Sequence, residues 1–251
     1  MKALITGATS GIGKAIAQEL SRRGVSLILT GRNENALLQM QETLPVHTEI
    51  IALDLAENQA PFTLYEFCKN KHVDILVNNA GLMKRVPMIE MSHTDFLRVI
   101  DVHVGGAFNC SKAVLPDMIA KREGKIINIC SMMSELGRET VSAYAAAKGA
   151  LKMLTRNIAS EYGEYNIQCN GMGPGYIATA QTAPLRETQP DGSRHPFDTF
   201  ICAKTPSGRW GDPEDMVGPC VFLASHASDF VNGQILYADG GILAYIGRQP
   251  K

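Results

Sequence analysis

The sequence predicts a single α/β domain in which a doubly wound parallel sheet of about seven strands carries helices on both faces. Short apolar segments, suited to buried strands, alternate along the chain with longer helical patterns. A glycine-rich turn joins the first strand to the first helix as early as residue 6. With 251 residues and 45% hydrophobic composition, the chain can form one domain over residues 1–251, and a second domain is not required.

Composition argues against several classes of function. The 24 basic and 25 acidic residues give a net charge of −1, which does not favour nucleic acid as a partner. No apolar run is long enough to span a bilayer, and the first residues lead directly into a strand, so we expect no membrane segment and no signal peptide. Six widely separated cysteines are typical of a reduced, cytoplasmic protein. No closely spaced His/Cys cluster occurs, so we expect no metal site.

The first strand covers residues 3–5, and the glycine-rich turn over 6–13 opens a helix that runs to about residue 23. Its glycines allow a tight turn, a close approach of the backbone to a pyrophosphate, and packing of the helix on the strand. The N–H groups at the helix N-terminus then face the phosphates. The expected dinucleotide contacts here are Gly7, Thr9, Ser10, Gly11, Ile12 and Gly13.

The second strand, residues 25–30, is followed by Arg32, nineteen residues after Gly13. At roughly this distance a dinucleotide site reads the adenosine ribose, with a carboxylate for a free 2′-hydroxyl or an arginine for a 2′-phosphate. The arginine is present and the carboxylate is missing, so the sequence predicts NADP(H) over NAD(H). The alternative, with NAD(H), is that Glu34 is near enough to act and that Arg32 is a surface residue stacked on adenine.

The third strand, residues 49–54, ends in Asp54, a candidate acceptor for the adenine amino group. The fourth begins at residue 74 and leads into a turn over 78–81, where Asn79, Ala80 and Gly81 are expected to contact the cofactor. Turn formation is the structural alternative for the two asparagines, Asn78 and Asn79. For these two residues, stabilisation of the central strand and contact with the cofactor ribose are equally supported roles.

Helical patterns begin at residue 92 and continue through 111–120, before a fifth strand over 125–130. Ser131 closes this strand, so its hydroxyl should emerge at the carboxyl edge of the sheet, where ligands of such sheets bind. Tyr144 and Lys148 lie four residues apart on a helix and therefore share a face. A neighbouring cation lowers the pKa of a phenol toward working pH. The three groups together suit a carbonyl substrate, whereas the Tyr/Lys pair alone is more often a solvated helix face.

The sixth strand, residues 166–172, leads into a loop that also lies at the carboxyl edge. Pro174, Gly175, Ile177 and Thr179 are its expected cofactor contacts, with the backbone of Ile177 and the hydroxyl of Thr179 available to a nicotinamide carboxamide. Residues 180–210 form an unusually long connection, which is typical of a functional lid or of disorder. A seventh strand over 233–238 completes the sheet.

Five motifs in this order resemble the short-chain dehydrogenase/reductase family along almost the whole chain: the turn over 6–13, Asn78-Asn-Ala-Gly81, Ser131, Tyr144-x-x-x-Lys148 and Pro174-Gly175. The resemblance implies a Rossmann-type fold and NAD(P)(H)-dependent oxidoreduction of an alcohol/carbonyl pair. It also implies that Tyr144 is the catalytic acid/base, that Ser131 holds the substrate oxygen, and that Lys148 binds the nicotinamide ribose. A homotetramer, formed through two long helices and the seventh strand, is implied as well; the apolar tail over 242–246 suits such a contact or packing on its own domain.

From about Met83 onward the sequence is similar to the gluconate 5-dehydrogenase branch, which interconverts gluconate and 5-ketogluconate, whereas residues 1–80 match the wider family only. This similarity implies a small, polar sugar-acid substrate. Two alternatives remain: a reductase for another carbonyl, such as a 3-oxoacyl group or a bulky ketone, and a nonenzymatic NADP(H)-binding interaction protein.

The family's fourth catalytic residue is an asparagine that holds a relay water, and His103 stands in its place here. Either the imidazole takes over the relay and adds its own pH dependence, or it bonds a backbone carbonyl and sets the helix geometry. A sugar acid also needs a cation near Ser131 and Tyr144. Arg85, and after it Arg138, are best placed to receive the carboxylate, because a guanidinium fork matches that group.

Overall fold

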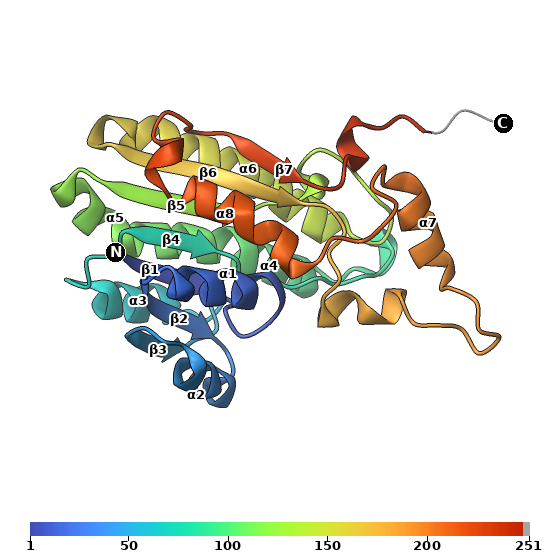
Figure 1. The fold of residues 1–251 in the computed structure, drawn as a ribbon, viewed down its shortest axis with the longest axis horizontal. Coiled ribbons are helices and arrows are strands. Elements are labelled where there is room, and N and C mark those ends of the chain that lie inside the picture. Colours follow the sequence, from blue (N-terminus) through green and yellow to red (C-terminus); the bar gives the residue numbers. More distant parts are fainter. Residues whose placement is uncertain (248–251) are drawn as a thin grey trace.

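The computed structural model describes residues 1–247 and contains one seven-stranded sheet in the order β3-β2-β1-β4-β5-β6-β7 (Figure 1). Every pairing between neighbouring strands is parallel. The strands are β1 (Lys2–Thr6), β2 (Ser26–Gly31), β3 (Thr48–Ala52), β4 (Ile75–Asn78), β5 (Gly124–Ile129), β6 (Ile167–Pro174) and β7 (Ile235–Ala238). The predicted doubly wound parallel sheet is confirmed.

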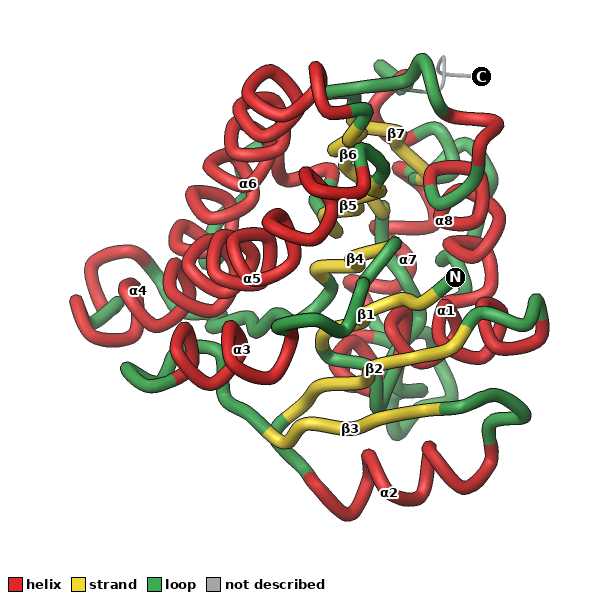
Figure 2. The backbone as a smooth tube through the Cα atoms, turned by 90° about the vertical axis from the view of Figure 1, so that its left-hand side faces the viewer, coloured by secondary structure: helices red, strands yellow, loops and turns green. Residues whose placement is uncertain are grey.

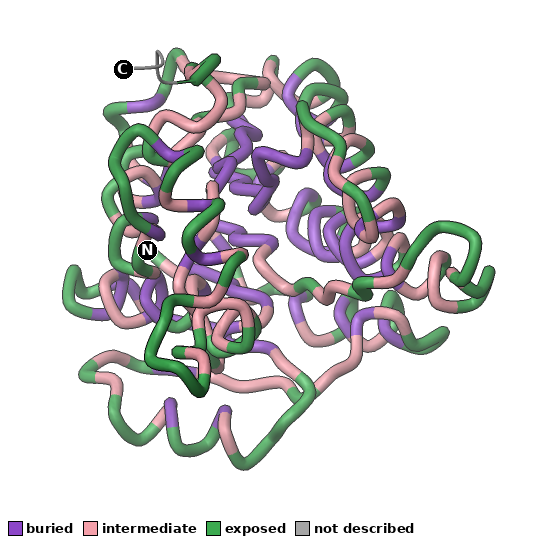
Figure 3. Tube along the Cα trace, turned by 90° about the vertical axis from the view of Figure 1, so that its right-hand side faces the viewer, coloured by how far each residue is buried: buried purple, intermediate pink, exposed green. Residues whose placement is uncertain are grey.

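The described residues contain eight α-helices, and α7 stands apart from the two layers of helices that flank the sheet (Figures 1 and 2). The eight helices are α1 (Gly11–Arg22), α2 (Glu34–Thr43), α3 (Ala60–Cys68), α4 (His93–Ile100), α5 (Gly106–Lys121), α6 (Ser142–Tyr162), α7 (Pro196–Lys204) and α8 (Val217–Leu223). Successive residues of a strand face opposite sides, so Ala3 and Ile5 pack with α1 and α8, whereas Leu4 packs with α3, α5 and α6. Figure 3 shows the buried residues gathered along the strands and the helix faces that cover them.

The strand order reverses between β1 and β4, which are neighbours in the sheet although two strands separate them in sequence. Connections leave β1 and β4 toward opposite faces, so a crevice opens at the carboxyl ends of these strands. This is the edge at which the sequence placed the cofactor and Ser131.

Two segments differ from the expectation. The predicted helical region after residue 92 is divided by a π-helical turn, Asp101–Gly105, between α4 and α5. The connection over 180–210 contains a 3-10 helix, Ala180–Leu185, and α7, which stands at the right-hand edge of Figure 1. The side chain of His195 caps α7 by accepting the Phe197 N–H at 3.0 Å, and Pro196 is its first residue. A helix this short gave no periodic signal in the sequence.

Within residues 1–247, no helix has both the length and the apolar character needed to cross a membrane. The same part of the chain holds no group of three or more His, Cys, Asp or Glu side chains suited to a metal ion. Of the apolar tail, Ile242 begins a short 3-10 helix, Ile242–Ala244, and Ile246 is fully exposed.

Candidate active site

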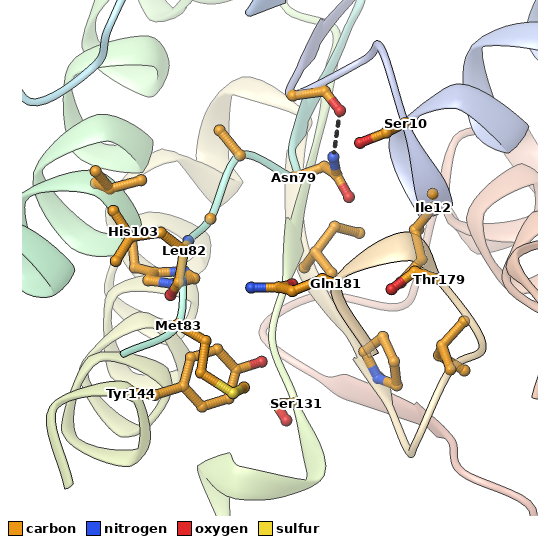
Figure 4. Close-up of a pocket in the computed structure, with 18 of the residues that line it drawn as sticks. Ser10, Ile12, Asn79, Leu82, Met83, His103, Ser131, Tyr144, Thr179 and Gln181 are labelled. Carbon is orange, nitrogen blue, oxygen red and sulfur yellow. Dashed lines mark hydrogen bonds between the residues drawn. The ribbon is translucent and has the colours of Figure 1, made fainter. Parts of the chain in front are cut away.

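A cavity of about 350 Å³ opens at the carboxyl edge of the sheet (Figure 4). Its walls come from the turn after β1, from segments that follow β2 to β6, from the π-helical turn and from α6. It is lined by these residues predicted from the sequence: Gly7, Thr9, Ser10, Gly11, Ile12, Arg32, Asp54, Asn79, Ala80, Gly81, Arg85, His103, Ser131, Arg138, Tyr144, Lys148, Pro174, Gly175, Ile177 and Thr179. Side chains separated by up to 172 positions in the sequence therefore share one site.

The glycine-rich turn is shaped to receive phosphate. Gly7 and Gly11 have φ angles of +64° and +51°, a region that favours glycine. A Cβ on Gly7 would lie 2.9 Å from the Ala80 Cα, so the turn also touches the loop after β4. Ser10 caps α1 without a side-chain hydrogen bond, and the first turn of α1 has no acidic residue. The N–H groups of this helix end are thus available to an anion.

Gly13, which the sequence predicts to contact the cofactor, has a packing role in the structure. It does not line the cavity. A Cβ on Gly13 would lie 2.4 Å from the Gly7 carbonyl oxygen and 2.4 Å from Asn79 Nδ2, so the missing side chain allows α1 to pack against its own turn.

Arg32 and Asp54 lie at the adenosine end of the cavity. Arg32 is exposed at the end of β2. Asp54 lies just beyond β3, where one carboxylate oxygen accepts the Ala56 N–H at 3.1 Å and the other pairs with Arg98 of α4. Burial raises the pKa of Asp54, but the Ala56 N–H and Arg98 outweigh it and hold that pKa below its usual value. Arg98 was not recognised from the sequence, because a single arginine on an amphipathic helix gives no signal.

The two asparagines after β4 have different surroundings. Asn78 is buried at the end of the strand and donates to the Asn128 side chain of β5 at 2.8 Å, which ties the central strands together. Asn79 donates to the carbonyl oxygens of Thr6 and Gly7 at 2.9 and 3.0 Å. Asn79 therefore lines the cavity and also fixes the glycine-rich turn through these two hydrogen bonds.

Ser131 and Tyr144 meet at the opposite end of the cavity (Figure 4). Ser131 follows β5 and is buried; its hydroxyl oxygen accepts the Met133 N–H at 3.1 Å, which leaves the hydroxyl proton free to donate. Burial raises the pKa of Tyr144, and the nearby Ser131 hydroxyl lowers it by a smaller amount. The phenol therefore keeps its proton at neutral pH.

Lys148 lies one helical turn beyond Tyr144 and is buried. Its ammonium donates to the Ile129 carbonyl at 2.5 Å and lies 5.5 Å from the centre of the Tyr144 ring. Burial lowers the pKa of Lys148 to about 8. The sequence predicted that this cation lowers the pKa of the tyrosine, whereas the net change at Tyr144 is upward. The reason is that burial of the phenol raises its pKa, while the ammonium lies over the ring and bonds to the end of β5.

His103 sits in the π-helical turn and is buried. Its Nε2 lies 2.8 Å from the Leu82 carbonyl oxygen and 3.2 Å from the Leu82 backbone nitrogen, so it donates to the carbonyl in one tautomer and accepts the N–H in the other, and Nδ1 has no partner among the described residues. The ring meets that of Tyr144 edge-on at 5.3 Å. Burial, followed by the charge of Lys148, lowers the pKa of His103 to about 3. A buried, neutral ring bonded to the backbone of Leu82 favours the structural role over the titrating relay.

Arg85 and Arg138 line the end of the cavity that holds Ser131 and Tyr144. Desolvation of the head group, followed by the charge of Arg138, lowers the pKa of Arg85. Among the described residues, Asp54 is the only acidic residue that lines the cavity, and it already pairs with Arg98. The substrate end is therefore positively charged.

Sequence reasoning missed several lining residues. They are Leu82, Met83, Cys130, Met133, Val141, Tyr176, Gln181, Thr182 and Leu185. Figure 4 shows the Gln181 side chain within the cavity, between Asn79 and Tyr144. Thr182 donates to the Ile177 carbonyl at 2.7 Å and accepts the Thr179 N–H at 3.0 Å, so it fixes the loop after β6. The spacing Thr179-x-x-Thr182 is a capping-box pattern that could have indicated this turn.

Comparison with known proteins now decides the family. A family model described as short chain dehydrogenase matches residues 1–190. The chain belongs to the short-chain dehydrogenase/reductase family, a family of NAD(P)-dependent oxidoreductases. A 2-dehydro-3-deoxy-D-gluconate 5-dehydrogenase of Formosa agariphila is 47% identical over 98% of this chain and 94% of the relative.

Two solved structures extend the likeness. The 2-keto-3-deoxy-D-gluconate dehydrogenase from Streptococcus agalactiae is 57% identical, with a TM-score of 0.81, over 98% of this chain and 95% of that one. A gluconate 5-dehydrogenase from Burkholderia cenocepacia in complex with NADP and tartrate is 38% identical, with a TM-score of 0.87, over 98% of this chain and 96% of that one. The similarity that the sequence indicated from Met83 onward therefore extends through the N-terminal half of this short-chain dehydrogenase.

Proposed function

We propose that this short-chain dehydrogenase is an NADP(H)-dependent enzyme that interconverts an alcohol and a ketone on a six-carbon sugar acid, of the gluconate/5-ketogluconate type. One observation carries the proposal: a serine, a tyrosine and two arginines, which have no carboxylate partner within residues 1–247, line the same cavity as a glycine-rich turn suited to phosphate. The names of the relatives, which are dehydrogenases of sugar acids, support the substrate class.

A second candidate substrate is 2-dehydro-3-deoxy-D-gluconate. Two relatives with this substrate in their names are 47% and 57% identical and three others are 37–38% identical, compared with 38% for the gluconate 5-dehydrogenase from Burkholderia cenocepacia. Both candidates carry a carboxylate at one end. The names of the Formosa and Burkholderia enzymes place the reaction at C5, so the same machinery would serve either acid.

The residues of the cavity have separable tasks. When bound, NADP(H) supplies or accepts the hydride at the reacting carbon. Ser131 donates a hydrogen bond to the substrate oxygen, and Tyr144 gives that oxygen its proton in reduction or removes it in oxidation. Because burial raises its pKa, Tyr144 holds a proton ready for reduction at neutral pH. Lys148, a cation below pH about 8, binds the nicotinamide ribose and favours the phenolate when oxidation requires it.

An arginine at each end of the cavity suits a negative charge, the 2′-phosphate of the cofactor at one end and the carboxylate of the substrate at the other. Arg32, beside the phosphate-binding turn, would receive the 2′-phosphate of NADP(H), and the solved structure with bound NADP supports this choice. Arg85 would receive the carboxylate of the acid, since a guanidinium binds that group through two parallel hydrogen bonds. NAD(H), which has no 2′-phosphate, would lose the contact with Arg32.

Assembly and location complete the proposal. We infer a homotetramer, and the exposed apolar side chains Phe108 on α5 and Met153 on α6 support contact through these helices. The six cysteines are free and five are buried, which supports a reducing, cytoplasmic location.

The test is a coupled panel of cofactors and substrates. We expect NADP⁺ to be reduced with gluconate or with 2-dehydro-3-deoxy-D-gluconate, more efficiently than NAD⁺, and without turnover of a neutral polyol or reduction of a 3-oxoacyl thioester. Preference for the thioester or for a bulky neutral ketone would replace the sugar acid by another carbonyl. Tight NADPH binding with no turnover of any substrate would favour an interaction protein.

A further inference from the structure

Arg138 is held differently from Arg85. Its guanidinium carbon lies 5.2 Å from the centre of the Phe197 ring on α7, a cation–π contact. Its Nε is buried and has no hydrogen-bond partner among the described residues. Arg85 is instead exposed at the cavity mouth. The two cations are close enough for Arg138 to lower the pKa of Arg85.

Phe197 is itself fixed by a small aromatic cluster. Its ring meets Tyr176 at 5.7 Å and 70°, and Trp210 at 6.4 Å. The Trp210 indole donates to the buried Asp198 carboxylate, one residue after Phe197, at 2.7 Å. Helix α7 therefore holds the Phe197 ring in a fixed position against Arg138, although Phe197 does not line the cavity itself.

Two guanidiniums at one end of a cavity exceed what a single carboxylate needs, because one arginine fork already binds both carboxylate oxygens. A guanidinium has only donors, so the second arginine matches an acceptor next to the carboxylate. A carbonyl oxygen is only an acceptor. A hydroxyl can also accept, but its own proton then needs an acceptor, and the lining of this end has no carboxylate to offer among the described residues.

We propose that Arg138, positioned by Phe197, is a specificity-determining residue that makes the site prefer a sugar acid with an oxo group at C2 over one with a hydroxyl at C2. This inference rests on the proposed function and refines its substrate class. Arg85 binds the carboxylate, Arg138 binds the C2 oxygen, and Ser131 and Tyr144 act on the distant reacting carbon. Phe197 acts through Arg138.

The test compares 2-dehydro-3-deoxy-D-gluconate with 3-deoxy-D-gluconate, which differs only in carrying a hydroxyl at C2. The measured quantity is the ratio of kcat/KM for the two acids with NADP⁺. Ring–chain equilibria of the acids in solution are the same for every variant, so they cancel when ratios are compared. We expect the ratio in the unmodified protein to favour the 2-oxo acid.

Arg138→Met should lower that ratio by roughly tenfold or more, because a hydrogen bond from a charged donor to the 2-oxo group is lost. Arg138→Lys should keep much of the preference, since an ammonium also has only donors, but should bind both acids less tightly because it lacks the planar fork. Phe197→Leu should lower the ratio roughly threefold to tenfold through KM, and should have little further effect in an Arg138→Met background. Phe62→Leu is the control, because Phe62 lies on α3, outside this aromatic cluster, and is 67% exposed.

An unchanged ratio in Arg138→Met, in protein that melts normally and turns over both acids, overturns the proposal. Equal effects of Phe197→Leu and Phe62→Leu overturn the positioning role of Phe197. If the unmodified protein turns over neither of these acids nor gluconate, the proposed function fails and this inference fails with it, whereas turnover of gluconate alone refutes only the inference. Turnover of both acids with a ratio that favours the hydroxyl refutes only the inference.

Discussion

Gly81 gives a sharp prediction, because its missing side chain makes room for the His103 ring. A Cβ at this position would lie 2.4 Å from His103 Cε1 and 3.1 Å from Nδ1. Ordinary carbon contacts are about 3.5 Å, so in Gly81→Ala the ring must move by roughly 1 Å. The ring is held by the Leu82 carbonyl and lies edge-on to Tyr144, so its movement disturbs the catalytic phenol.

Such overpacking costs about 1–3 kcal/mol of unfolding free energy. For a chain of this length each kcal/mol lowers Tm by roughly 2–4 °C, so Gly81→Ala should melt roughly 2–12 °C lower. A displacement of this size at a catalytic group reduces kcat by up to about 10²-fold. Thermal denaturation and steady-state kinetics measure both effects. Gly149→Ala on α6 is the control, because nothing lies within 4 Å of its added Cβ, and it should melt at the same temperature or higher.

A second substitution, at His103, distinguishes this steric clash from a general effect of replacing Gly81. In Gly81→Ala/His103→Asn the ring atoms that meet the new Cβ are gone, so the double variant should be more stable and more active than the sum of the single variants predicts, by about 1 kcal/mol or more. Normal Tm and kcat in Gly81→Ala, or strictly additive losses in the double variant, would refute the proposed packing of Gly81, His103 and Tyr144.

Three further predictions concern charge. Arg32→Ala should reduce kcat/KM for NADPH by roughly tenfold or more while sparing NADH, and equal losses with both coenzymes would contradict a 2′-phosphate contact. Arg85→Met should raise KM for the sugar acid and leave the Kd for NADPH unchanged, as initial rates and a fluorescence titration will show; a weakened Kd for NADPH with an unchanged KM for the acid would contradict a carboxylate contact. His103→Asn should leave the pH–rate profile unchanged between pH 5 and 9, because the pKa of His103 is lowered to about 3. The unfolded chain binds a proton at this histidine below about pH 6.5 and the folded protein does not, so the unmodified protein should lose stability relative to His103→Asn as pH falls from 6.5 toward 3. The same difference in Tm between the two proteins at pH 7 and at pH 4.5 would contradict this.

The sequence predicted the sheet because each parallel strand is a short, continuous apolar run. The carboxyl edge also followed directly: Gly7, Asn79, Ser131 and Thr179 each stand at or just after a strand end, and parallel strands bring such residues together. Element ends were less accurate. Pro174 belongs to β6, because its missing N–H costs nothing at the strand's last residue.

Side-chain direction could not be predicted. The spacing of Tyr144 and Lys148 placed both on one helix face, but only the structure shows the ammonium bonded to Ile129 and the pKa of the tyrosine raised by burial. Helix α7 could not be predicted from the sequence for a related reason. Its residues are fixed by long-range contacts to Trp210 and Arg138, and no local periodicity records them.

The most direct measurement of the central claim is the activity and NADPH affinity of Tyr144→Phe. The variant removes one hydroxyl from a ring whose other contacts stay in place. We expect kcat/KM for the sugar acid to fall by about 10²–10⁴-fold, the usual contribution of a general acid/base, while fluorescence titration gives an unchanged Kd for NADPH. Near-normal turnover in Tyr144→Phe would show that the proton comes from another group.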